Sequence, residues 1–187
     1  MSDNRKRCVK VPVIMQMEAL ECGAACLDMI MAYHRKWVPL EQVRVDCGVS
    51  RDGSKASNMV NAAKAYGLQV KAHRYGMDAV QNKVSYPAII HWNFNHFVVL
   101  NGFKGNKAIL NDPARGQVEI SLEEFDKSFT GICLEFEPSD TFVQDGKKDS
   151  VLKFAAKRLH GSSLSIVFVM LTTILTAFIS LLTPVFS

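Results

Sequence analysis

The chain has 187 residues, of which 48% are hydrophobic, and its 22 Lys and Arg against 18 Asp and Glu give a net charge of +4. No basic cluster is interleaved with aromatic residues, so nucleic-acid binding is not indicated. The first three quarters of the chain is long enough to bury the core of one compact domain and leaves no room for a second large one.

We expect this domain to stay in the cytosol. The apolar run Val11 to Met15 follows basic residues but is too short for the hydrophobic region of a signal peptide. The cysteines are an odd set without regular spacing, so in a reducing compartment we expect free thiols. They are Cys8, Cys22, Cys26, Cys47 and Cys133.

Taken in chain order, the first half predicts mainly helices. Residues 16–34 carry apolar side chains at steps of three and four, which predicts a helix from about Gly23 to Tyr33. The predicted elements of this half are an extended segment over 11–17, helices over 23–33, 39–48 and 55–66, a strand over 68–73 and one helical turn over 77–82.

The second half predicts mainly strands, because apolar residues gather in short runs between turn residues. Ser121 and Glu124 form a capping box that opens a short helix. Helices followed by an antiparallel sheet give an α+β pattern. The predicted strands cover 86–92, 96–103, 107–113 and 132–136, with turns at 93–95 and 104–106.

The end of the chain predicts a membrane anchor after a domain over 1–137. Residues 164–187 run for 24 residues without a charge. At about 1.5 Å per residue, such a helix crosses a hydrocarbon core of about 30 Å. Residues 138–149 are a polar linker, and 150–163 predict an amphipathic helix on the membrane surface. Basic residues ahead of the span place residues 1–163 on the cytoplasmic side. The abrupt apolar end indicates a fragment of a longer chain.

Cys22 is the first candidate for chemistry, because it falls in or just before the first turn of the helix that begins near Gly23. The unpaired N–H groups and the positive end of the helix dipole favour a thiolate there by about 0.3–1 kcal/mol. The thiolate is the nucleophilic form of cysteine. A lone cysteine on an apolar helix face is more often a small buried hydrophobic residue, so this assignment depends on partners elsewhere in the chain.

A cysteine nucleophile needs a base and a group that orients this base. If the turn at 104–106 closes a hairpin, residues whose numbers sum to about 208–210 lie opposite each other, which places His96 across from residues 112–114. Asp112 then reaches the imidazole and supports its charged form. His91 is the competing base, but it has no acidic residue at the mirrored position.

Gln16 lies six residues before Cys22, just outside the helix. In acyl transfer the developing oxyanion needs preformed donors, and a side-chain amide with the Cys22 backbone N–H would supply two. Removing one such donor lowers the rate about 10²–10³-fold. On its own, a Gln before a helix is more often in contact with solvent.

A zinc site is an alternative use of the same residues. Cys22 and Cys26 are four apart on one helix, and His91 and His96 lie in the strand-rich half. Zinc sites usually have closely spaced cysteine pairs in loops, and no second pair is present. The competing interpretation of Cys26 is a packed core residue.

The order Gln16, Cys22, His96 and Asp112, with the residues that flank them, resembles the papain-like cysteine peptidase domain at the N-terminus of peptidase-containing bacteriocin ABC transporters. The resemblance covers about residues 10–137, and the amphipathic segment and membrane span that follow match the layout of that family. The motifs that carry it are Gln16, Glu21-Cys22-Gly23, His96-Phe97-Val98-Val99-Leu100 and Asn111-Asp112-Pro113-Ala-Arg-Gly116.

The resemblance implies a papain-like fold, with N-terminal helices packed on an antiparallel sheet, and a reaction. The reaction removes the leader from a ribosomal peptide precursor, of bacteriocin or lanthipeptide type, after Gly-Gly, Gly-Ala or Gly-Ser. It implies that Cys22 attacks, that His96 is the general base and acid, that Asp112 orients His96, and that Gln16 builds the oxyanion hole.

The implied partner is a precursor peptide whose amphipathic helical leader lies in an apolar groove. The implied setting is the bacterial plasma membrane, reached through residues 150–187, in a transporter that is a homodimer. The peptidase needs no cofactor or metal, and ATP is expected only for an ATP-binding domain, whose GxxxxGK[ST] motif this chain lacks. The alternative function is a docking domain that recruits peptides without cleaving them. Four methionines are adaptable groove candidates or ordinary core residues: Met15, Met17, Met59 and Met77.

Overall fold

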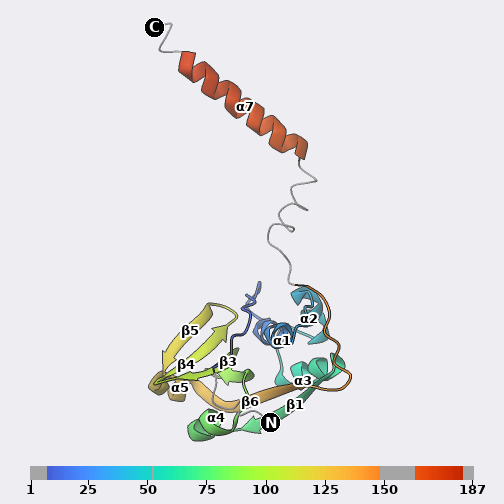
Figure 1. The fold of residues 1–187 in the computed structure, drawn as a ribbon, viewed down its shortest axis with the longest axis vertical. Helices are drawn as coiled ribbons and strands as arrows, with labels where there is room; N and C mark the ends of the chain where they lie inside the picture. The colour runs from blue at the N-terminus through green and yellow to red at the C-terminus, as the bar shows by residue number, and fades with distance from the viewer. Residues whose placement is uncertain (1–7, 52, 148–162, 183–187) are drawn as a thin grey trace. The chain divides into compact units, whose positions relative to one another are not determined.

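The computed structural model describes residues 8–51, 53–147 and 163–182 (Figure 1). The chain divides into two compact units, Met1–Lys147 and Lys148–Ser187. The first unit contains the residues expected to carry chemistry, and the second contains one described helix.

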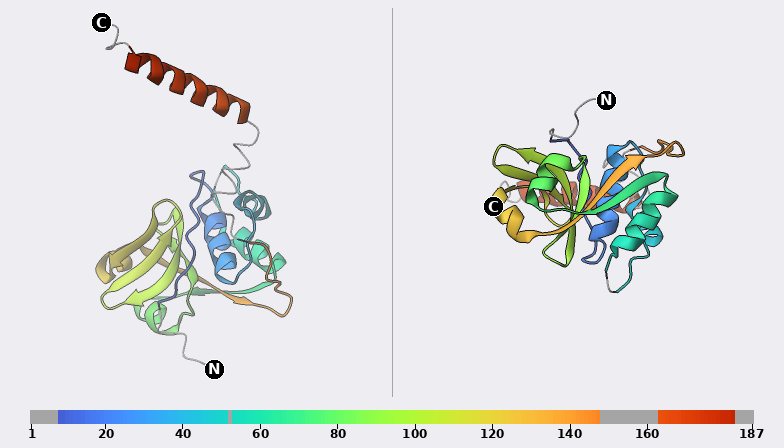
Figure 2. Two further views of the ribbon diagram at one scale, coloured as in Figure 1. Left: turned by 45° about the horizontal axis from the view of Figure 1, so that its top comes forward. Right: turned by 90° about the horizontal axis from the view of Figure 1, so that it is seen from below.

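The first unit is an α+β structure built on one antiparallel sheet with the strand order β1-β6-β2-β3-β4-β5 (Figures 1 and 2). Its helices are α1 (Cys22–Tyr33), α2 (Leu40–Asp46), α3 (Ala56–Ala65), α4 (Met77–Lys83) and α5 (Leu122–Ser128). Its strands are β1 (Leu68–Arg74), β2 (Ala88–Trp92), β3 (His96–Lys104), β4 (Lys107–Asp112), β5 (Gly116–Ser121) and β6 (Phe129–Pro138).

The sheet separates two hydrophobic cores. Ile89 and Val99 face the core that α1, α2 and α3 share with the sheet, whereas Ile90 and Val98 face the core that contains Phe125 of α5. Strands β2 and β3 are therefore buried on both faces, which is why their sequences are continuous apolar runs and do not alternate with polar residues.

Helix α1 is the centre of the first core. Eleven of its 12 residues are buried, because β3 covers one side while α2 and α3 cover others. The predicted helix is confirmed, but the single apolar face expected for it is wrong. Small residues at its start, such as Gly23 and Ala24, leave room for this close packing.

The structure adds elements that the sequence pattern did not predict. Strand β5 follows the turn after Asp112, and only Ile120 of its residues is buried. Strand β6 begins at Phe129, three residues before the predicted start at Ile132. Strand β5 lies at the edge of the sheet and buries one face at most, so it lacks the apolar run that reveals a central strand.

The expected linker over 138–149 lies along the first unit as far as the structure describes it. The Trp37 N–H donates a hydrogen bond to the Asp145 carbonyl at 2.8 Å. Phe142 packs against the core of α1 and contacts the ring of His34, whose pKa is lowered by burial.

The second unit contains helix α7 (Ser163–Leu182), which has 20 residues and no charged side chain. Among the helices of the described ranges, none has the length and hydropathy needed to cross a membrane. The predicted span over 164–187 stays a prediction. The predicted surface helix over 150–163 lies outside the described residues, except for Ser163 at the start of α7.

Asp28, in the middle of α1, makes the stability of the first unit depend on pH. Its side chain is buried, and Oδ1 has no hydrogen-bond partner within the described part of the chain. Burial, with a smaller effect from the charge of Glu41, raises the pKa of Asp28 from 3.8 to about 7. The native state therefore binds more protons than the unfolded chain between these two values, and stability is lost as the pH rises from the lower value through the higher one.

We predict that Asp28→Asn removes this loss, because the amide cannot ionise. The free energy of unfolding of the variant should exceed that of the parent chain at pH 8 by about 2–4 kcal/mol. The two values should converge as the pH falls toward 4. Chemical denaturation at several pH values, followed by tryptophan fluorescence, measures the difference, and parallel pH profiles would contradict the assignment.

Candidate active site

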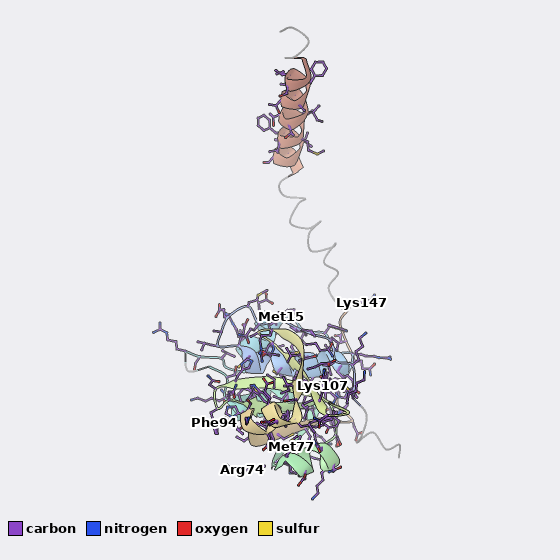
Figure 3. All side chains as sticks on the ribbon, turned by 90° about the vertical axis from the view of Figure 1, so that its left-hand side faces the viewer. Met15, Arg74, Met77, Phe94, Lys107 and Lys147 are labelled. Carbon is purple, nitrogen blue, oxygen red and sulfur yellow. The ribbon has the colours of Figure 1, made fainter. Side chains whose placement is uncertain are left out.

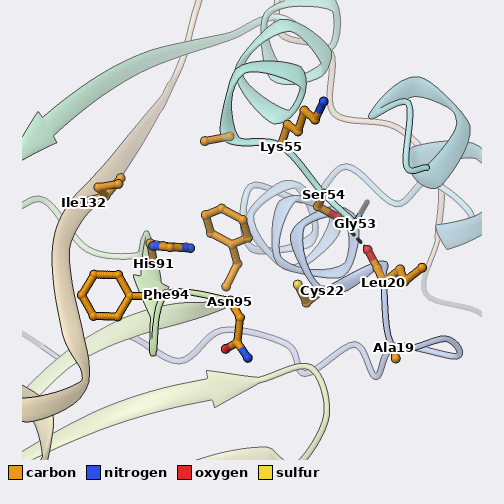
Figure 4. Close-up of a pocket in the computed structure, with 12 residues that line it drawn as sticks. Ala19, Leu20, Cys22, Gly53, Ser54, Lys55, His91, Phe94, Asn95 and Ile132 are labelled. Atoms are coloured by element: carbon orange, nitrogen blue, oxygen red, sulfur yellow. Dashed lines mark hydrogen bonds between the residues drawn. The ribbon is translucent and has the colours of Figure 1, made fainter. Parts of the chain in front are cut away.

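Cys22 is the first residue of α1 and lies at the boundary between the helices and the sheet. Its backbone N–H belongs to the first turn, where no partner within the helix exists. The neighbouring Gly23 lets the loop before α3 approach, since a Cβ atom at this position would lie 2.6 Å from Ser54 Cβ. Ser54 Oγ donates to the Leu20 carbonyl at 3.0 Å, which fixes the loop beside Cys22 (Figure 4).

His96 and Asp112 come together from the start of β3 and the end of β4. His96 Nε2 lies 2.9 Å from Asp112 Oδ1. The strands pair Val99 with Asn111, so the numbers of facing residues sum to 210 and the two side chains are diagonal neighbours. The predicted pairing of His96 with Asp112 is therefore present in the structure.

Cys22 completes the group, because its side chain is within hydrogen-bonding reach of His96. This hydrogen bond is the largest influence on the pKa of His96 and raises it; burial acts in the opposite direction, and the hydrogen bond with Asp112 adds to the rise. Since Asp112 occupies Nε2, the ring atom left for the Cys22 thiol is Nδ1. The arrangement can hold a proton between sulfur and imidazole and stabilise the imidazolium.

Asp112 is itself held by a set of donors that sequence reasoning missed. The Ala114 N–H donates to Oδ1 at 2.8 Å, and Arg115 Nε donates to Oδ2 at 2.7 Å. Burial alone would raise the pKa of Asp112, but these donors and His96 outweigh it and lower the pKa below its ordinary value. The carboxylate stays ionised and oriented toward the imidazole.

Gln16 lies on the extended segment before α1, close to the same turn. Its backbone N–H donates to the Pro113 carbonyl at 2.9 Å, directly after Asp112. Its Oε1 is buried and has no hydrogen-bond partner among the described residues. The structure thus places Gln16 beside the turn that follows Asp112, with the acceptor oxygen of its side-chain amide unpaired among the described residues.

Glu21 fixes the turn between Gln16 and Cys22, and sequence reasoning gave it no role. Its buried carboxylate accepts hydrogen bonds from the backbone N–H groups of Met17 and Glu18, the latter at 2.9 Å. Arg44 of α2 lies 3.7 Å from the same carboxylate. A Glu directly before the helix was visible in the sequence, but its two backbone partners were not.

A cavity of about 400 Å³ opens beside Cys22. Figure 4 shows the Ser54 loop on one side of Cys22, with His91 and Phe94 on the other. The cavity is lined largely by apolar side chains from the helices, from the β2–β3 turn and from Ile132 of β6. It can accommodate an extended peptide with an apolar residue near the reacting sulfur.

His91, the competing base, lies in the wall of this cavity and not in the Cys22 group. Thr130 Oγ1 donates to the His91 carbonyl at 3.1 Å, so it accepts from His91 Nδ1, 3.0 Å away. Burial, with a smaller effect from the charge of His96, lowers the pKa of His91. His91 is thus held by Thr130 in the cavity wall, whereas Asp112 holds His96, so His91 is a wall residue and His96 is the base.

The remaining candidates from the sequence are the possible metal ligands and the four methionines. All five cysteines are free, and the described residues contain no group of three or more His, Cys, Asp or Glu side chains able to hold a metal ion. Met59 is a core residue, whereas Met15 is 48% and Met17 76% exposed, and Met77 is partly buried. The core interpretation is therefore wrong for Met15 and Met17.

Comparison with known sequences agrees with this geometry. The chain matches the Peptidase C39 family over residues 10–141. The colicin V secretion/processing ATP-binding protein CvaB of Escherichia coli is 33% identical over 177 residues, which cover 94% of this chain and 25% of that protein. The probable microcin-H47 secretion/processing ATP-binding protein MchF of the same species is 32% identical over the same shares. The chain thus spans about a quarter of the length of these curated relatives.

Solved structures agree as well. A double glycine motif protease from an AMS/PCAT transporter, crystallised in complex with the leader peptide, is 66% identical with a TM-score of 0.70, over 72% of this chain and 96% of that one. The peptidase domain of Streptococcus ComA shares the fold at 24% identity, with a TM-score of 0.65 over 70% of this chain and 98% of that one. The α+β peptidase fold expected for the domain is confirmed. The chain belongs to the peptidase C39 family.

Proposed function

We propose that the chain is a cysteine endopeptidase that removes the leader from ribosomal peptide precursors after a double-glycine-type site, in support of export by an ABC transporter. The observation that carries the proposal is the 2.9 Å hydrogen bond of His96 with Asp112, and it is supported by Cys22, which is the largest influence on the pKa of His96. The names of the relatives support the substrate, since they process and secrete bacteriocins and include a double glycine motif protease.

In the proposed reaction, His96 Nδ1 takes the proton of Cys22, and the thiolate attacks the carbonyl carbon of the second small residue. The oxyanion receives hydrogen bonds from the Gln16 amide and the Cys22 backbone N–H. The His96 imidazolium, held by Asp112, then donates its proton to the leaving amine. Water hydrolyses the thioester with His96 as base and releases the leader.

The preference for small residues follows from the wall beside the sulfur. Ser54 packs closely against Gly23, and its hydrogen bond to the Leu20 carbonyl holds the loop before α3 in this position. A substrate residue that passes this wall has little room for a side chain. The wider cavity beyond it receives the apolar side chain of a residue further toward the leader's N-terminus.

The wider setting is part of the proposal and rests on the sequence and the relatives. Residues 164–187 anchor the chain in the bacterial plasma membrane, with the peptidase on the cytoplasmic side. The precursor has an amphipathic helical leader and is a bacteriocin or lanthipeptide, and the complete transporter is a homodimer that uses ATP outside this chain. Recruitment without cleavage is not favoured, since the Cys22 group is complete.

We predict that Cys22→Ala abolishes cleavage of a Gly-Gly precursor, a loss of about 10⁴–10⁶-fold in kcat, because no other group can form the acyl-enzyme. His96→Ala should behave in the same way. Mass spectrometry of the released leader measures the rate. Cys133→Ala is the matched control, since this buried cysteine lies in the other core; it should keep its activity. Cleavage by a folded C22A chain would end the proposal.

We predict that the pKa of His96 falls in Cys22→Ala, because the hydrogen bond that raises it most is lost. Asp112→Asn should lower it too, because a neutral amide replaces the carboxylate that stabilises the imidazolium. Titration of the imidazole C–H signals by NMR reports the pKa without any substrate. The same value in C22A and in the C133A control would show that Cys22 does not contact His96.

We predict that Phe94 destabilises the fold but contributes to binding of the substrate. It is 83% exposed at the margin of the unit (Figure 3), and both Asn93 and Phe94 have positive φ, 47° and 60°. Asn-Gly is the favoured pair for such a turn. Phe94→Gly should therefore stabilise the fold by up to about 1 kcal/mol and raise KM for the precursor about 10-fold, with kcat little changed.

Thermal denaturation and steady-state kinetics test the two halves of this prediction separately. Val45→Ala, at an exposed apolar residue of α2, is the control and should leave KM unchanged. An unchanged KM in F94G would mean that the exposed ring does not contact the substrate.

A further inference from the structure

The N-terminal segment that carries Gln16 lies along the β3–β4 hairpin and is hydrogen-bonded to it at both ends. At one end the Val9 N–H donates to the Asn101 carbonyl at 2.9 Å. At the other end the Gln16 N–H donates to the Pro113 carbonyl at 2.9 Å. The segment has no regular secondary structure, so these contacts decide where Gln16 lies.

Two fully buried asparagines connect the segment and the hairpin between these ends. Asn101 Nδ2 donates to Asn111 Oδ1 at 2.8 Å. Asn111 Nδ2 in turn donates to the Val11 carbonyl at 3.0 Å. The two side chains form a continuous path of hydrogen bonds from β3, through β4, to the middle of the N-terminal segment.

A β-bulge makes this path possible. Leu100 pairs with Leu110 and Gly102 with Ile109, so Asn101 is an extra residue on β3. Its carbonyl and side chain are thereby released from the regular ladder. Gly102 has φ of 133°, which residues with a side chain rarely adopt, and it permits the distortion. Bulges near active sites commonly redirect side chains in this way.

Buried amides stabilise the position of a segment less than apolar side chains would. Asn101 Oδ1 has no partner among the described residues, and a buried polar atom without a partner destabilises the fold by about 1–3 kcal/mol. An apolar pair would fill the space without this penalty. Amides, however, fix direction and register, which apolar contacts do not.

We propose that Asn101 and Asn111 are positioning residues that set where Gln16 lies relative to Cys22 and His96. The inference rests on the proposed function, because Gln16 must act as an oxyanion donor. Asn111 directly precedes Asp112, so the same strand end that orients the base also sets the N-terminal segment. The relative positions of the oxyanion donor Gln16 and the base His96 are thereby fixed before the substrate binds.

A double-mutant cycle with Gln16→Ala tests this inference. Asn111→Ala should lower kcat about 10-fold or more with little change in KM, since misplacing a catalytic group by about 1 Å lowers rates by up to about 10²-fold. In the Gln16→Ala background, the same change should lower kcat less than about 2-fold, because the group it positions is gone. Single-turnover cleavage of a Gly-Gly precursor provides the rates.

Tyr86→Phe is the matched control, because it removes one buried hydrogen bond, from Tyr86 to the Val80 carbonyl at 2.8 Å, outside this path. It should leave kcat unchanged in both backgrounds. Equal losses from Asn111→Ala in the parent chain and in the Gln16→Ala chain would overturn the inference and leave the peptidase function intact. A parent chain that does not cleave the precursor is, by contrast, a failure of the proposed function.

Amide hydrogen exchange adds a readout that does not depend on activity. In Asn111→Ala we expect faster exchange at the Val9 and Gln16 N–H groups, with α5 amides unchanged; unchanged protection of the segment would overturn the inference. Should Asn111→Ala fail to fold, Asn101→Ala tests the same path, because it removes one donor and keeps the bond from Asn111 to Val11.

Discussion

The contact of α1 with β3 fixes the geometry on which the active site depends. Cys26 Sγ donates to the Phe97 carbonyl at 3.3 Å in the interior of the first core. Cys22 lies one helical turn before Cys26, and His96 immediately precedes Phe97, so this buried contact sets the separation of sulfur and imidazole. Burial raises the pKa of Cys26 well above its ordinary value, which keeps this thiol a proton donor. Cys22 and Cys26 lie one turn apart but differ in role. Cys22 faces His96, whereas Cys26 donates a hydrogen bond within the core.

The site is preorganised by hydrogen bonds that do not involve the substrate. Asp112 divides its two oxygens between the imidazole and a neighbouring backbone N–H on one side and Arg115 on the other. Glu21 holds the turn before the helix through two backbone N–H groups. Since these groups are oriented in the free protein, little reorganisation is needed when charge develops in the reaction. The geometry therefore has its origin in contacts between segments that are far apart in the sequence.

This distribution explains how much could be predicted from the sequence. The helix at Cys22 and the hairpin with His96 and Asp112 follow local patterns, of period and of turn residues, and both were predicted. Strand β5 was missed because an edge strand has only one face to bury. A linker was predicted over 138–149 because these residues are polar and lack periodicity. Arg115, Asn101 and Asn111 were given no role, since no local pattern shows which distant backbone groups a side chain will reach.

Three residues that break local rules lie on the hairpin that carries His96 and Asp112, or on the turn before it. Phe94 occupies a turn position that suits glycine, Asn101 interrupts a strand, and Asn111 places an amide in a core. All three lie on β3, on β4 or on the turn that leads into β3, which are the elements that deliver His96 and Asp112. A hairpin with such features does not hold its conformation by propensity alone; the N-terminal segment and α1 must impose it. Catalytic geometry and folding of the hairpin are then coupled, because the contacts that align Gln16 and Cys22 with the base also keep the hairpin in place.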